Sequence, residues 1–139
     1  MDKKHSQDWD RRIQQNYRLW MSDGVASDEE MFNTGKRDLD LLIPETDTEQ
    51  LVFLEIGCGV GRLLLHAARR FNRVLGVDIS RSALEIARKF LKGIDNVQLI
   101  LTADYKLYSV PDESVDIVGS FATLFSVPTE VLCGYLLEA

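Results

Sequence analysis

The sequence predicts an α/β fold: a Rossmann-like parallel sheet with flanking helices, preceded by N-terminal helices. Residues 51–56 are nearly all apolar and run directly into GCGVG, a turn with glycine at every second position. Residues 73–77 form a second apolar segment, which ends at the acidic residue Asp78. Strand-like and helix-like segments alternate after residue 51, as in strand–helix–strand units that build a parallel sheet with right-handed crossovers.

Two amphipathic helices are predicted before the sheet. A helix over residues 7–21 is indicated by four residues at helical spacing: Trp9, Ile13, Tyr17 and Trp20. A second helix is predicted over residues 28–43, with these side chains facing inward: Met31, Phe32, Leu39, Leu42 and Ile43. We interpret the aromatic residues of the first helix as core, and an aromatic wall for a substrate is the alternative.

The remaining elements follow from the alternating pattern. Strands are predicted over residues 51–56, 73–77, 97–101 and 115–121. Helices are predicted over residues 62–71, from Ser80 or Ser82 to Gly93, and from Pro128-Thr129 onward. Residues 1–50 are therefore expected to form an N-terminal helical cap, and residues 51–139 a Rossmann-like domain that is incomplete.

Composition excludes several classes of protein. The net charge of -6 disfavours binding to a nucleic-acid backbone, and 45% apolar residues indicate a packed core. Cys58 and Cys133 are too few for a disulfide framework or a zinc site. No apolar run approaches the roughly 20 residues that span a bilayer, and the polar start lacks the apolar core of a secretion signal. We therefore expect a cytoplasmic protein.

The glycine turn indicates a nucleoside-binding crevice. Glycine lets the main chain approach a ligand closely, and ligands lie beyond the carboxyl ends of parallel strands. A dinucleotide fingerprint would read G-x-G-x-x-G, whereas this turn reads G-x-G-x-G and Arg62 follows it. The carboxylate of Glu55, just before the turn, would repel a pyrophosphate and attract a cationic amino group. This favours S-adenosylmethionine, which carries an ammonium and a sulfonium but no phosphate, over a nicotinamide cofactor.

Two further acidic residues stand at predicted strand ends. Asp78 is placed to accept the ribose hydroxyls, and its alternative role is that of a helix N-cap. Asp104 can accept a hydrogen bond from the exocyclic amine of adenine, although a solvated loop aspartate is the alternative. Tyr105 or Ile79 is placed to lie against the adenine face.

Residues 51–125 resemble the cofactor-binding half of a class I S-adenosylmethionine-dependent methyltransferase. The resemblance rests on four segments in order: EIGCGVG, GVDIS, TADY and PDESVDIVGSF. It implies that the methionine part lies among Glu55, Gly57, Cys58, Gly59 and Gly61. It places the ribose and adenine edge against Asp78 and Ile79, adenine against Ala103, Asp104 and Tyr105, and the sulfonium near Phe121.

The resemblance also implies a reaction. We expect methyl transfer to a small-molecule acceptor, with no catalytic base identified among the residues. Cys58 is interpreted as a small turn residue, His66 as a surface residue, and His5 as part of a loose terminus. Helices before the first strand often cover the donor in this family, which makes Tyr17, Trp20 and Phe32 candidate pocket residues.

The family's sheet usually has seven strands in the order 3-2-1-4-5-7-6, and we find four. We therefore expect a sheet that is truncated after its fourth strand, in the order 3-2-1-4. The strand at 115–121 would then be an open edge, which invites self-association. A non-catalytic module that binds the donor is the alternative function, and a nicotinamide-dependent oxidoreductase is a weaker one.

Overall fold

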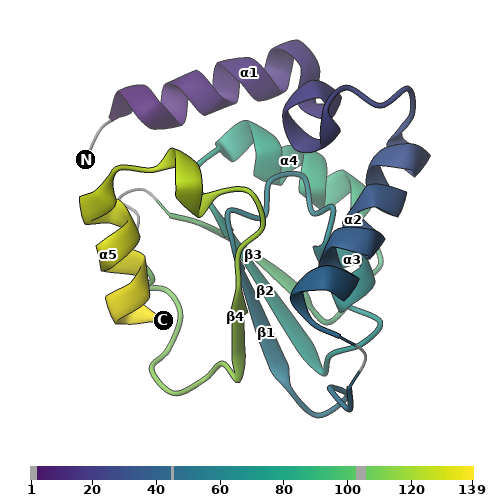
Figure 1. The fold of residues 1–139 in the computed structure, drawn as a ribbon, viewed down its shortest axis with the longest axis vertical. Coiled ribbons are helices and arrows are strands. Elements are labelled where there is room, and N and C mark those ends of the chain that lie inside the picture. Colours follow the sequence, from purple (N-terminus) through teal and green to yellow (C-terminus); the bar gives the residue numbers. More distant parts are fainter. Residues whose placement is uncertain (1–2, 45, 103–105) are drawn as a thin grey trace.

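The computed structural model describes residues 3–44, 46–102 and 106–139. Its centre is a parallel four-stranded sheet in the order β3-β2-β1-β4, which confirms the predicted fold and strand order. The strands are β1 (Val52–Ile56), β2 (Arg73–Asp78), β3 (Val97–Leu101) and β4 (Ile117–Gly119) (Figure 1). All four strands run the same way, so their carboxyl ends meet at one edge of the sheet.

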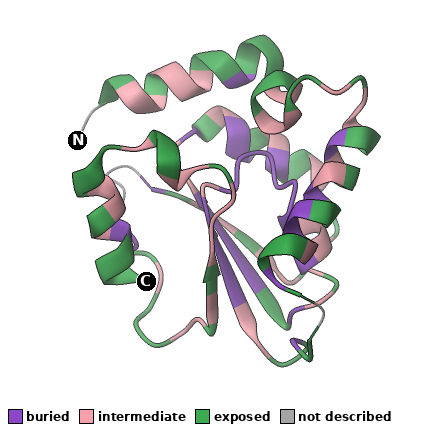
Figure 2. Ribbon diagram, viewed as in Figure 1, coloured by how far each residue is buried: buried purple, intermediate pink, exposed green. Residues whose placement is uncertain are grey.

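The helices cover the two faces of this sheet unequally. They are α1 (Lys3–Ser22), α2 (Asp28–Leu42), α3 (Leu64–Ala67), α4 (Arg81–Phe90), the 3-10 helix η1 (Leu124–Ser126) and α5 (Thr129–Glu138). On one face, Phe53 and Val74 share a buried cluster with side chains of α2, α3 and α4. On the other face, Leu54 and Leu75 pack with Tyr135 of α5. Buried residues accordingly concentrate in the two central strands, β1 and β2, and in the glycine turn, whereas β3 and β4 have none (Figure 2).

Three elements differ from the sequence predictions. The helix expected over 62–71 is reduced to α3. In the turns on either side of it, some backbone N–H groups bond to the carbonyl three residues earlier and others to the carbonyl four residues earlier. The strand expected over 115–121 is reduced to β4, and Asp116 instead accepts a side-chain hydrogen bond from Val52 N at 2.8 Å. Leu42 is exposed rather than inward-facing, because Leu39 and Ile43, one helical turn apart, form the buried face of α2.

Helix α1 is broken at Asn16. This residue has an extended backbone (φ -164°, ψ 87°), and its Oδ1 accepts a hydrogen bond from Leu19 N at 3.2 Å. Asn16 thus acts as an N-cap for the last part of α1, which turns away from the first part. The ring centroids of Trp9 and Trp20 are consequently 6.0 Å apart, whereas eleven residues of straight helix would separate them by roughly 16 Å along the axis.

Polar contacts fasten α1 to the turn between β2 and α4. Asp10 Oδ1 accepts hydrogen bonds from Ser80 Oγ at 2.7 Å and from Ser82 N at 2.9 Å. Ser6 Oγ donates to Ile79 O at 2.8 Å. Of the two serines predicted as caps, Ser80 is the N-cap of α4, since its Oγ accepts from Ala83 N. The first helix therefore lies across the carboxyl end of β2.

Helix α2 is held to α3 by two arginine–aspartate pairs. Arg62 pairs with Asp38, both buried, and Arg70 pairs with Asp40 at 3.2 Å. Gly35 allows the close approach, because a Cβ there would collide with the backbone of Arg62. Among the helices that the structure describes, none is both long and apolar enough to cross a membrane.

Candidate functional site

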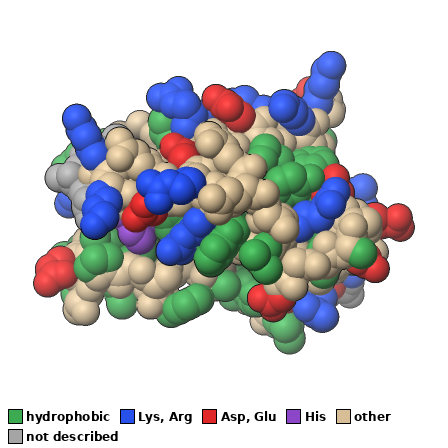
Figure 3. Space-filling model, turned by 90° about the horizontal axis from the view of Figure 1, so that it is seen from above, with side chains coloured by type: hydrophobic (Ala, Val, Ile, Leu, Met, Phe, Trp, Pro, Cys, Tyr) green, Lys and Arg blue, Asp and Glu red, His purple; other side chains and the backbone are tan. Residues whose placement is uncertain are grey.

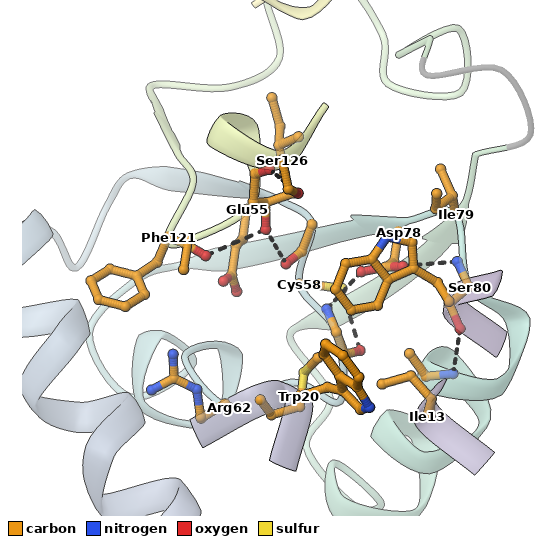
Figure 4. Close-up of a pocket in the computed structure, with 18 of the residues that line it drawn as sticks. Ile13, Trp20, Glu55, Cys58, Arg62, Asp78, Ile79, Ser80, Phe121 and Ser126 are labelled. Carbon is orange, nitrogen blue, oxygen red and sulfur yellow. Dashed lines mark hydrogen bonds between the residues drawn. The ribbon is translucent and has the colours of Figure 1, made fainter. Parts of the chain in front are cut away.

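A pocket lies where the carboxyl ends of β1 and β2 meet the glycine turn, with α1 as its outer wall (Figure 4). The loop after β4, the 3-10 helix η1 and Tyr135 of α5 complete the wall. The cavity volume is about 110 Å³. Pockets for small ligands usually measure roughly 300–1,000 Å³, so α1 and the β4 loop lie close against the strand ends in this state.

Glu55 lies at the base of this pocket. Glu55 belongs to the buried strand β1 and is only 2% exposed. Its Oε2 has no hydrogen-bond partner in the described part of the chain. Burial raises the pKa of Glu55 to about 8, although the positive charge of Arg62 opposes the rise. A buried carboxyl oxygen without a partner is destabilising, so this group is poised to gain one from a bound molecule.

Arg62 brings the positive charge nearest to Glu55, and it was not predicted as a site residue. Its guanidinium donates to Asp38 and to Thr34 Oγ1, and lies 5.5 Å from the ring centroid of Phe121. Its place directly after the glycine turn, seven positions from Glu55, is the sequence feature that could have identified it. Arg62 therefore connects the base of the pocket to α2.

Asp78 joins the end of β2 to the glycine turn. Its Oδ2 accepts from Gly59 N and its Oδ1 accepts from Ser80 N, both at 2.8 Å. Burial raises the pKa of Asp78, and the hydrogen bonds from Ser80 and Gly59 oppose the rise. Each carboxylate oxygen has a further lone pair. Asp78 can thus hold the turn in place and still accept hydroxyl groups from a ligand.

The three turn glycines are required by the protein's own backbone and packing. Their φ values are +75° at Gly57, +53° at Gly59 and +84° at Gly61, in the left-handed region. A Cβ would collide with Thr123 at Gly57 and with Met21 at Gly59, and would lie 2.9 Å from Leu91 at Gly61. These neighbours explain the glycines without a ligand.

The pocket brings together most of the residues predicted for the donor site. Its lining includes Glu55, Gly57, Cys58, Gly59, Asp78, Ile79 and Phe121. Gly61 lies outside this lining and packs against α4. Ala103, Asp104 and Tyr105 lie outside the described residues. Burial raises the pKa of Cys58 well above its usual value, so the thiol is neutral, in agreement with its interpretation as a small turn residue.

The aromatic residues of α1 divide between two roles. Trp9 and Trp20 line the pocket, so the interpretation of both as core was wrong. The break at Asn16, which helical periodicity could not reveal, turns Trp20 toward the pocket. Tyr17 instead donates to Asp28 at 2.7 Å and its ring packs against Phe90, as does the ring of Phe32.

The two histidines also differ from the predictions. His5 lies within α1 and lines the pocket, where it accepts a hydrogen bond from Trp9 Nε1 at 3.1 Å. His66 is half-buried, and its Nε2 lies 2.7 Å from Phe32 O. Burial lowers the pKa of His66. It therefore connects α3 to α2 and lies away from the pocket.

Residues 53–138 match a family described as methyltransferase domain. The chain belongs to this family. The four-stranded sheet and the chains of similar fold place the family in the class I S-adenosylmethionine-dependent methyltransferases, and S-adenosylmethionine is the cofactor of that class. The predicted family, fold class and cofactor are confirmed. No curated protein matches the chain.

Several solved structures have a fold similar to that of this chain. Phosphoethanolamine N-methyltransferase 1 of Haemonchus contortus, in complex with phosphoethanolamine and S-adenosylhomocysteine, is 14% identical with a TM-score of 0.76, over 97% of this chain and 28% of that one. An S-adenosylmethionine-dependent methyltransferase described as putative, from Listeria monocytogenes, is 25% identical with a TM-score of 0.58, over 76% of this chain and 49% of that one.

The cyclase SpnF is 15% identical with a TM-score of 0.69, over 96% of this chain and 55% of that one. The chain thus spans less than two thirds of each of these structures. A cyclase among proteins of similar fold also means that the fold alone does not determine the reaction.

Proposed function

We propose that this chain binds S-adenosylmethionine in the pocket between the glycine turn and α1, and transfers its methyl group to a small-molecule acceptor. The observation that carries the proposal is the buried, unpartnered Oε2 of Glu55 at the base of the pocket. Burial keeps Glu55 protonated near neutral pH in the unliganded chain; the donor's ammonium would favour its ionised form, whereas a pyrophosphate would disfavour it. Membership of a methyltransferase family supports the same choice against a nicotinamide cofactor.

The proposed contacts follow the order of the strands. Glu55 faces the ammonium, and the backbone of the turn at Gly57, Cys58, Gly59 and Gly61 surrounds the methionine part. The free lone pairs of Asp78 accept the ribose hydroxyls, with Ile79 at the adenine edge. Ala103, Asp104 and Tyr105 are proposed for adenine, and Phe121 for the sulfonium side.

The donor supplies an electrophilic methyl group on its sulfonium. The chain's own residues would orient the acceptor and exclude water, which suffices when the acceptor atom is already a good nucleophile. The small-molecule acceptor is supported by a fold neighbour that was crystallised with phosphoethanolamine. A cap formed by residues 1–50 agrees with α1 as the outer wall of the pocket.

Donor binding would require α1 to move outward, because the cavity of about 110 Å³ is small for such a ligand. Met21 lies against Gly59 and Thr123 against Gly57, so both side chains would have to give way. The break at Asn16 provides a place where α1 can change direction.

Calorimetric titration with S-adenosylhomocysteine tests the donor site. We expect saturable binding, and a loss of about tenfold or more in affinity for both Glu55→Gln and Asp78→Asn, because each removes a charged acceptor. Glu85→Gln, on the exposed face of α4, is the matched control and should bind like the wild type. Absence of binding by chain that circular dichroism shows to be folded would refute the proposal.

Turnover is a separate question from binding. A panel of small amines and alcohols, assayed for S-adenosylhomocysteine release, distinguishes the enzyme from a non-catalytic module. Donor binding without release on any acceptor would favour the module.

A further inference from the structure

We propose that Arg12 forms an anion-binding subsite at the rim of the pocket, and that the methyl acceptor is a small molecule carrying a carboxylate or phosphate group. The subsite consists of Arg12 with the indoles of Trp9 and Trp20, and is called the Arg12 subsite below. The assignment of its ligand as the methyl acceptor rests on the proposed function, whereas anion binding at the subsite does not.

The guanidinium of Arg12 makes cation–π contacts with two rings that line the pocket. Its Cζ lies 4.5 Å from the ring centroid of Trp20 and 5.1 Å from that of Trp9. The two indoles contact each other edge to face. Arg12 is exposed while both rings beneath it line the pocket, which places the positive charge at the rim.

Stacking leaves the hydrogen-bonding edge of this arginine available. The guanidinium of Arg12 has no hydrogen bond or ion pair with a side chain of the described residues, and its two ring contacts are the interactions that hold it. A guanidinium that stacks on aromatic rings keeps its planar fork of N–H donors free for bidentate contact with a carboxylate or phosphate. The stacking also restricts the side chain in advance, which lowers the entropic cost of binding.

The chain builds this subsite through the break in α1. Trp9 and Arg12 are neighbours on one helical turn, but Trp20 would lie far along a straight helix. The extended backbone of Asn16 brings Trp20 back beneath Arg12. A break that served only to end the helix would not require a tryptophan at this position.

The surroundings favour an anion. The net charge of the chain is -6, yet Lys and Arg side chains gather on the face that α1 and α4 cover (Figure 3). The exposed basic residues of these two helices are Lys3, Lys4, Arg11, Arg12, Arg81, Arg88 and Lys89, of which Arg88 lines a separate hollow beside β3, and Glu85 is an exposed acid of α4. The nearby Asp8 pairs with Arg11 at 3.3 Å. An anionic acceptor would thus be attracted to the pocket mouth and held there.

Benzoate and benzamide are the probes, because they share a ring and size and differ in charge. Both tryptophans of the chain belong to the Arg12 subsite, so intrinsic fluorescence reports on it directly. Each probe is titrated with and without S-adenosylhomocysteine. We expect benzoate to bind more tightly than benzamide, and Arg12→Gln to weaken benzoate binding about tenfold while leaving benzamide unchanged.

Arg11→Gln is the matched control, since it removes the adjacent charge but no stacked group, and it should bind benzoate like the wild type. Arg12→Lys keeps the positive charge but loses the planar set of N–H donors, so its affinity for benzoate should lie between those of the wild type and Arg12→Gln. Equal benzoate affinity of wild type and Arg12→Gln, or no benzoate binding at all, would overturn the subsite. Failure of S-adenosylhomocysteine to bind would refute the proposed function instead. The benzoate titration without S-adenosylhomocysteine would still test anion binding at the Arg12 subsite.

Discussion

Asp10 and Ser80 are 70 residues apart in the sequence, and their side chains form a hydrogen bond of 2.7 Å. The same Asp10 oxygen accepts from Ser82 N, so an aspartate of α1 satisfies one of the backbone N–H groups that have no partner within α4 at its start. One side chain thereby fixes the outer wall of the pocket to the end of β2.

Asp10→Ala is expected to loosen this wall. Loss of two hydrogen bonds at a helix start should lower the free energy of unfolding by about 1–2 kcal/mol. Amide hydrogen exchange should accelerate in the first part of α1 and stay slow in β1 and β2. Asp8→Ala, which removes only a surface pair with Arg11, should cost below about 0.5 kcal/mol. Equal exchange rates in both variants would contradict the role of Asp10 in holding α1 to the end of β2.

Glu55 gives the protein a stability that falls as the pH rises. Its pKa is about 8 in the folded chain and lies near the ordinary value of 4.5 when unfolded, so the folded state holds the extra proton between these values. Stability from this group is complete below about pH 4.5 and is lost as the pH rises toward 8. Between these pH values the free energy of unfolding can fall by up to about 1.4 kcal/mol per pH unit because of this group.

Glu55→Gln should remove this contribution, because the amide does not titrate. Urea unfolding at several pH values measures the difference between the two proteins, and taking that difference cancels Asp78, whose raised pKa acts in the same direction. Parallel pH profiles for wild type and variant would show that Glu55 is not protonated in the folded chain.

Gly59→Ala should be more damaging than Gly93→Ala. Both glycines have positive φ, but a Cβ at Gly59 meets Met21, whereas one at Gly93 meets nothing within 4 Å. At Gly93 the backbone effect alone should lower the free energy of unfolding by about 1 kcal/mol. At Gly59 the loss should be roughly 1–3 kcal/mol larger. Thermal unfolding of both variants, and of Gly59→Ala combined with Met21→Ala, measures the contact. No recovery in the double variant would exclude Met21 as the cause.

The outer edge of β4 pairs with no strand in the described part of the chain. Such an edge can pair with a second copy, so we expect a mass that rises with concentration in sedimentation analysis. Val118→Lys places a charge on this strand and should lower the tendency to associate. A monomer at every concentration would contradict edge pairing.

The strands and the pocket's location could be predicted because apolar runs, glycines and strand-end acids are local features of the sequence, whereas the strand order was predicted from the resemblance to the family. The contacts of Arg62 could not, since its partner Asp38 lies 24 residues away on a helix whose docking depends on Gly35. The preferred interpretation of Trp9 and Trp20 as core failed for a related reason, whereas the resemblance to the family had named Trp20 as a candidate pocket residue. Periodicity assumes an unbroken helix, and only the backbone at Asn16 shows that α1 bends.

The pairing of Arg62 with Asp38 bears on any attempt to shorten this protein. Excision of the first fifty residues would remove Asp38 and leave a buried guanidinium beside Glu55 with no counter-ion of its own. The arginine would then neutralise the very carboxyl that is proposed to recognise an ammonium. A minimal version should therefore retain α2, even if α1 is dispensable for folding.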